Sequence, residues 1–203
     1  IVAGDEVKTS ALDDTFHESV KRRIIATIAL DIRATGQEIL DATLPIAEQA
    51  EREREAAVVA DLQDAVGQGG RGAAGGEATL EALQAGMVQT LVMADSYSEQ
   101  GWADFTLPLF GVGHVPSEHP AGGDVSVIVP VALEEELVRL ALQQDAEIDI
   151  IQSAVPVSEA EERAIPDAGH PLPVTDAARQ LNELGGVGAI FRFELGETPP
   201  ETV

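Results

Sequence analysis

The sequence predicts two α/β domains, each a mixed sheet covered by helices, joined by a glycine-rich linker. Three observations lead to this prediction. Segments with the apolar periodicity of helices alternate with short apolar runs typical of buried strands. Six of the ten residues 67–76 are glycine, which separates two such series. Hydrophobic residues make up 44% of the 203 residues, enough for a substantial core.

Residues 1–66 are expected to form the first domain. Its elements are, in order, a strand end at Ile1–Ala3, a helix over Ala11–Arg22, a strand over Ile24–Ile32 and a long helix over Thr35–Val66. Ser10 is placed to cap the first helix. Pro45 predicts a kink in the long helix, or its division into two, because proline removes a backbone donor.

Residues 77–195 are expected to form the second domain, with residues 196–203 as a flexible tail. Its elements are, in order, a helix over Glu77–Ala85, a strand over Met87–Met93, an inserted excursion over 96–124, a strand over Val125–Val131, a helix over Leu133–Gln143, a strand over Ala146–Ile151, a helix over Thr175–Leu184 and a strand over Val187–Phe193. Four glycines are assigned to turns or close approaches between these elements, and they are Gly86, Gly185, Gly186 and Gly188.

Composition restricts the possible functions. The formal net charge is −24, and residues 77–203 carry 22 acidic and only 4 basic side chains. We therefore do not expect this part to bind nucleic acid directly, since it would repel phosphate. The charge either serves solubility or meets a basic protein surface. The absence of cysteine excludes disulfides and thiolate metal sites and fits a reducing compartment.

The sequence shows no targeting signal. No apolar run is long enough to span a membrane, and no signal peptide is visible, so we expect a cytoplasmic location and no membrane partner. The chain begins with Ile1 in what resembles the end of a strand. We interpret it as a fragment that lacks N-terminal sequence.

Catalytic signatures are missing from the sequence. The motifs GxSxG, HExxH and GxxxxGK[ST] do not occur, and we predict no catalytic residue and no cofactor. A GxGxxG pattern at Gly67, Gly69 and Gly72 follows a long helix instead of a strand, so we interpret it as a hinge. His114, Glu118 and His119, with the distant His170, are too weak a set to predict a metal site.

Two groups of residues remain as candidate contact sites. Lys21, Arg22 and Arg23 form the one compact basic cluster, which either complements the end of a helix or contacts RNA. Trp102, Phe105 and Phe110 lie in the excursion of a chain with only 3% aromatic residues. They form either a small satellite core or a surface that contacts a partner.

The order of these elements resembles a known family. The helix, cap glycine and strand of Gly75–Asp95, and the helix, glycine pair and strand of Leu181–Phe193, are similar to the C-terminal domain of archaeal and eukaryotic class 1 peptide chain release factors and of Pelota. Residues 1–66, beginning with IVAGDEVK, resemble the latter part of the family's middle domain. The few lysines and arginines and the alanine-rich helices are more similar to divergent bacterial members.

The resemblance implies a ribosome-associated protein in termination, rescue of stalled ribosomes or ribosome silencing. It implies the ribosome and a translational GTPase as partners. The family's catalytic Gly-Gly-Gln loop does not occur in these residues; in the family it precedes the strand that matches Ile1–Ala3. The excursion, where many members carry a cysteine-rich zinc minidomain, has no cysteine.

Two other functions stay open. The chain could be a protein-interaction module that keeps the fold away from the ribosome. A small-molecule enzyme that uses a cleft between the domains is the third hypothesis.

Overall fold

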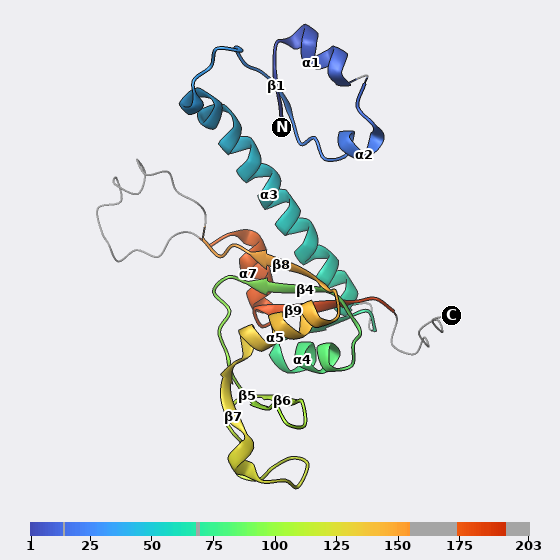
Figure 1. The fold of residues 1–203 in the computed structure, drawn as a ribbon, viewed down its shortest axis with the longest axis vertical. Helices are drawn as coiled ribbons and strands as arrows, with labels where there is room; N and C mark the ends of the chain where they lie inside the picture. Colours follow the sequence, from blue (N-terminus) through green and yellow to red (C-terminus); the bar gives the residue numbers. More distant parts are fainter. Residues whose placement is uncertain (14, 68–69, 155–173, 194–203) are drawn as a thin grey trace, which may run out of the picture. The chain divides into compact units, whose positions relative to one another are not determined.

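The computed structural model describes residues 1–203 apart from 14, 68–69, 155–173 and 194–203 (Figure 1). Contacts divide the chain into two compact units, Ile1–Arg54 and Glu55–Val203, called unit 1 and unit 2 below. The division falls within a long helix, upstream of the glycine-rich stretch at which the sequence predicted it. Both units combine helices and strands, so the predicted α/β class is confirmed.

Unit 1 is built on a small parallel sheet. Its elements are β1 (Val2–Gly4), α1 (Glu6–Asp13), α2 (Glu18–Lys21), β2 (Thr27–Ala29) and the first part of α3 (Gly36–Gly67). The two strands pair in parallel, with Val2 opposite Thr27 and Gly4 opposite Ala29. Among the described residues of unit 1, no large apolar side chain is fully buried. Parallel sheets are normally covered on both faces, so this unit leaves much apolar surface open.

The single helix predicted over Ala11–Arg22 is wrong, because the chain forms two helices here and neither is capped by Ser10. The Asp5 carboxylate accepts a hydrogen bond from the Val7 backbone N–H at 3.1 Å, so a helix starts there and contains Ser10. A second, shorter helix follows His17, whose Nδ1 accepts from the Ser19 N–H at 3.2 Å.

The helix α3 runs unbroken past Pro45, so the kink or break expected there does not divide it into two helices. An interior proline costs a helix about 3 kcal/mol, and neighbouring turns must offset that cost. The N-terminus has a capping box, in which the Glu38 carboxylate accepts from the Thr35 N–H and hydroxyl at 2.7 and 2.8 Å. Farther along, Val59 and Leu62 are fully buried in unit 2.

The described residues of unit 2 form two sheets. Its elements after α3 are β3 (Gly72–Ala74), α4 (Gly76–Gln84), β4 (Val88–Ala94), β5 (Gln100–Asp104), β6 (Leu109–Val112), the 3-10 helix η1 (Val125–Val127), β7 (Val129–Ala132), α5 (Leu133–Gln143), β8 (Glu147–Ile151), α7 (Asp176–Glu183) and β9 (Val187–Phe191). The larger sheet has the order β3-β9-β4-β8 and is mixed, because β4 is parallel to β8 and antiparallel to β9.

Helices cover both faces of this larger sheet. Along β4 the side chains alternate, so that Leu91 and Met93 join one apolar cluster and Val92 and Ala94 join the other. The first cluster includes residues of α4 and α5, and the second includes residues of α3 and α7. Unit 2 is therefore a three-layer α/β/α structure around the sheet (Figure 1).

The predicted linker over 67–76 needs correction, because part of it belongs to the sheet. Gly72–Ala74 form β3, an edge strand that pairs antiparallel with β9. A Cβ on Gly72 would lie 3.0 Å from the Ala65 Cβ and 3.1 Å from the Ala189 carbonyl oxygen. Small residues therefore let this strand approach α3 and β9 closely. Glycine-rich composition alone cannot distinguish such a closely packed strand from a flexible linker.

The excursion over 96–124 contributes to a second sheet, of order β6-β5-β7 and antiparallel throughout. The strand expected over Val125–Val131 is also corrected, since η1 takes up its first residues and the strand begins at Val129. Among the described residues, no helix combines the length and apolar character needed to cross a bilayer.

Candidate functional site

The basic cluster of unit 1 lies where α2 ends. Lys21 is the last residue of that helix, Arg22 is its C-cap and Arg23 follows. The Arg22 and Arg23 side chains are exposed, and Lys21 is half-buried. The helix has only four residues, so its dipole gives these cations little to neutralise. The exposed guanidinium groups stay candidates for contact with phosphate.

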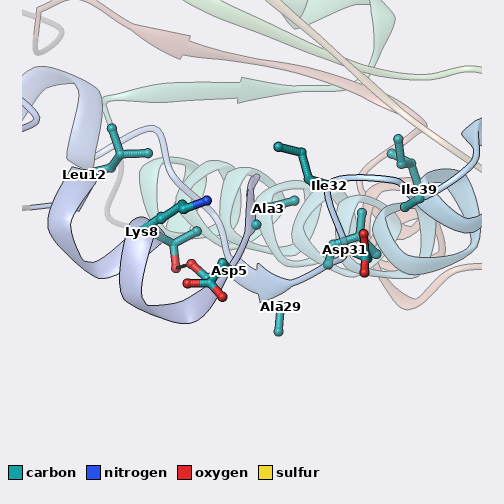
Figure 2. A pocket seen from close by; sticks show the side chains of 12 residues that line it. Ala3, Asp5, Lys8, Leu12, Ala29, Asp31, Ile32 and Ile39 are labelled. Atoms are coloured by element: carbon teal, nitrogen blue, oxygen red, sulfur yellow. Dashed lines mark hydrogen bonds between the residues drawn. The ribbon is translucent and has the colours of Figure 1, made fainter.

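A pocket of about 910 Å³ lies at the carboxyl ends of β1 and β2 (Figure 2). Lys8 and Leu12 of α1 line one side, and Ile32 and Ile39 line the other. Carboxyl ends of parallel strands are the usual place for ligands in α/β proteins. No sequence motif predicts this pocket, and its only signal in the sequence is the turn after each strand.

Three polar side chains that line this pocket have local hydrogen-bond partners. The Asp31 carboxylate accepts from the Arg33 N–H at 2.7 Å, as Asp5 does from Val7. The Thr9 hydroxyl donates to the Asp5 carbonyl oxygen at 3.1 Å. The pocket therefore combines apolar side chains with the ammonium group of Lys8.

The three aromatic residues of the excursion have different surroundings. Phe110 is buried in the same cluster as residues of α4 and α5, so it belongs to the main core of unit 2. Trp102 is buried against Gly111, where a Cβ would lie 2.3 Å from the indole Cζ2. Phe105 is exposed. Of the three residues proposed as partner contacts, only Phe105 presents its ring to solvent.

The excursion also holds a buried polar pair that sequence reasoning did not find. The His119 Nε2 lies 3.0 Å from the Asp104 Oδ2, and the Ala121 N–H donates to His119 Nδ1 at 3.1 Å. The Thr106 N–H and hydroxyl donate to the other Asp104 oxygen at 2.8 and 2.6 Å. Hydrogen bonds from Thr106, opposed by burial and reinforced by His119, lower the Asp104 pKa to about 2.

This arrangement bears on the weak metal motif of the sequence analysis. His119 faces Asp104 instead of His114 and Glu118, and His170 lies outside the described residues. Within the described ranges no group of three or more histidine or acidic side chains is gathered as metal ligands would be. The pair has a structural role, since it fastens the loop after β6 over the sheet face that carries Asp104.

The four glycines predicted at turns or close approaches are required for two different reasons. Gly86, Gly185 and Gly186 have φ values of 69°, 94° and 78°, a region that side chains disfavour. Gly188 does not have a positive φ, and its constraint is space. A Cβ there would lie 2.7 Å from Leu62 Cδ2 and 2.8 Å from the Ala73 carbonyl oxygen.

Comparison with known proteins gives matches in structure alone. No protein-family model matches the chain, and no curated protein sequence matches it. One similar structure is Dom34 of S. cerevisiae, a translation termination-like factor involved in RNA quality control pathways and interacting with Hbs1. Its TM-score is 0.51 at 11% sequence identity, and the match covers 96% of this chain and 46% of Dom34.

Two archaeal structures give lower scores. Pelota of Archaeoglobus fulgidus has a TM-score of 0.46 at 18% identity, covering 97% of this chain and 49% of that protein. Archaeal Pelota in a ribosome-bound model with ABCE1 has a TM-score of 0.49 at 18% identity, covering 96% and 43%. The chain spans about half the length of these proteins. The likeness to Dom34, a translation termination-like factor, confirms the predicted resemblance at the level of fold.

Proposed function

We propose that this chain is a ribosome-associated, release-factor-like protein that acts in translation termination, in rescue of stalled ribosomes or in ribosome silencing. The observation that carries the proposal is the shared fold with Dom34 over 96% of the chain. Dom34 is a translation termination-like factor, and the order of sequence elements implies the same class of role. The chain would then act in the cytoplasm.

The division of labour between the units follows from their charge. Unit 1 carries Lys21, Arg22 and Arg23 on its surface, which suits contact with ribosomal RNA. Residues 77–203, with 22 acidic side chains, suit a protein partner. Dom34 interacts with Hbs1, and the family resemblance implies a translational GTPase, so we propose that unit 2 binds such a protein.

A role in hydrolysis of peptidyl-tRNA is not part of this proposal. The 203 residues contain no Gly-Gly-Gln sequence. The action proposed here is therefore binding, in which the chain occupies a site on the ribosome and brings its partner there.

The alternative is a protein-interaction module that acts away from the ribosome. The acidity of unit 2 favours this second function as well, because a basic protein of any kind could meet it. Folds persist while roles change, so fold alone does not separate the two.

Co-sedimentation with 70S ribosomes across a salt series separates them. The proposal predicts saturable pelleting that weakens as salt rises, because phosphate contacts release counterions. Absence of pelleting at low salt, with and without a translational GTPase, would favour the alternative.

A further inference from the structure

One end of the three-stranded sheet carries exposed apolar side chains. Phe105 and Leu107, in the turn between β5 and β6, are 56% and 51% exposed. Val127 and Val129, where β7 starts, are 39% and 41% exposed. Since β5 and β7 run antiparallel with Ala103 opposite Val129, both pairs lie at the same end of the sheet. These four residues are called the apolar tip.

The apolar tip is held in place by buried contacts. The Phe105 ring meets the buried Phe110 ring edge-on, with centroids 5.9 Å apart. Hydrogen bonds connect the two residues that flank Phe105, because the Asp104 carboxylate accepts one from the Thr106 N–H and one from its hydroxyl. His119 holds the same carboxylate from the other side. An apolar surface that is fixed before binding loses little entropy when it meets a partner.

Acidic side chains adjoin the apolar tip in sequence and in space. From Gly72 to Val138 the sequence has ten acidic residues and no lysine or arginine. Asp124 caps η1, and hydrogen bonds from Ser126 lower its pKa, which keeps the carboxylate ionised beside Val127. Arg139 lies over the Phe110 ring, yet its Nε is 2.7 Å from a Glu136 oxygen. Asp124 and the exposed Glu118, which adjoins His119, therefore place negative charge beside the tip.

We propose that the apolar tip is a docking surface for a protein that presents an apolar face bordered by lysine and arginine. Charge complementarity selects this partner, since the flanks of the tip would attract cations and repel nucleic acid or an anionic membrane. The large exposed ring of Phe105 gives the apolar anchor that interfaces commonly use. This inference rests on unit 2 alone and holds whether or not the ribosome is the target.

A binding assay with a synthetic probe tests the docking surface. The probe is an amphipathic helical peptide with one leucine face and one lysine face, and a peptide with glutamate in place of lysine is its control. The full chain should bind the lysine peptide and not the glutamate peptide. The Phe105→Ser/Leu107→Ser variant should bind about tenfold more weakly or worse, the loss expected for an interface anchor.

Two further variants separate loss of the surface from general effects. Val7→Ser/Leu142→Ser removes two exposed apolar side chains elsewhere and should bind as the unaltered chain does. Phe105→Leu keeps the apolar character and should keep most of the affinity. Unchanged far-UV circular dichroism would show that the Ser variants fold.

Three results would overturn the docking surface. They are no binding of the lysine peptide to the unaltered chain, equal binding by the Phe105→Ser/Leu107→Ser variant, and binding of neutral phosphatidylcholine vesicles through the same residues. Ribosome pelleting is a separate measurement. The proposed function can therefore be contradicted while the docking surface is confirmed, and the docking surface can be contradicted while the proposed function is confirmed.

Discussion

His119 and Asp104 form a hydrogen-bonded pair whose side chains are almost wholly buried, with 3.0 Å between Nε2 and Oδ2. Because Nδ1 accepts from the Ala121 N–H, the imidazole proton lies on Nε2 and is donated to the carboxylate. A buried carboxylate is costly unless it is hydrogen-bonded. Here Thr106 and His119 supply those bonds, so the excursion owes its fixed shape to a polar cluster as well as to packing.

The first prediction concerns stability in acid. A pKa lowered in the folded state adds stability above the unfolded value, about 3.9 for aspartate. For Asp104 that contribution is lost as pH falls from about 4 toward its folded pKa of about 2. Urea unfolding between pH 6 and 2 should therefore show a smaller acid loss in Asp104→Asn than in the unaltered chain.

Asp145→Asn is the matched control for this measurement. Asp145 is exposed and has a φ of 54°, a conformation that asparagine adopts readily. This substitution should leave the acid loss as it is in the unaltered chain. Identical acid profiles for Asp104→Asn and the unaltered chain would show that the buried carboxylate does not govern acid stability.

The second prediction concerns the contact of α3 with the sheet. Gly188→Ala would place a Cβ 2.7 Å from Leu62 Cδ2 and 2.8 Å from the Ala73 carbonyl oxygen, so unit 2 must shift to admit it. Overpacking of this kind costs about 1–3 kcal/mol. We expect denaturant unfolding to show that loss for Gly188→Ala.

Gly67→Ala provides the comparison, because a Cβ there meets nothing within 4 Å. It lies at the end of α3, where alanine should be neutral or slightly stabilising. If both substitutions have the same effect, close packing at Gly188 is not what requires glycine there.

The third prediction concerns the unequal stability of the two units. Unit 2 has two buried apolar clusters, whereas the described part of unit 1 has a two-stranded sheet and no fully buried large apolar side chain. Local opening is easiest where few apolar contacts are broken. Hydrogen–deuterium exchange should therefore be faster for backbone amides of β1 and β2 than for those of β4 and β9. Equal protection of the four strands would contradict this reading.

The fourth prediction concerns the basic cluster. Reversing Lys21, Arg22 and Arg23 to glutamate should weaken binding to ribosomes and flatten its dependence on salt, since each lost phosphate contact lowers the slope. Arg33→Glu/Arg52→Glu/Arg54→Glu, which changes the net charge by the same amount at three other cations, tests whether net charge alone explains the effect. Unchanged affinity and slope for the cluster variant would remove it from the interface.

Elements with strong periodicity and a clear end could be predicted from the sequence. The helix over Leu133–Gln143 has the predicted bounds, because its apolar stripe is complete. The helix before Gly86 and the strand after Gly186 were also found, since positive φ at each glycine ends a helix sharply.

Other elements depend on distant partners and could not be predicted. Gly72–Ala74 has low strand propensity and becomes β3 only because β9 supplies its hydrogen bonds. Asp104 and His119 are fifteen positions apart and meet only through the folding of the loop after β6. The pocket beside Lys8 likewise exists only once β1 and β2 lie side by side.

Cryo-electron microscopy of 70S ribosomes saturated with the full-length chain tests the central claim most directly. The proposed function predicts density for the chain at one defined site, with Lys21, Arg22 and Arg23 of unit 1 against ribosomal RNA. Ribosomes without such density at saturating protein, or with unit 1 turned away from RNA, would contradict it.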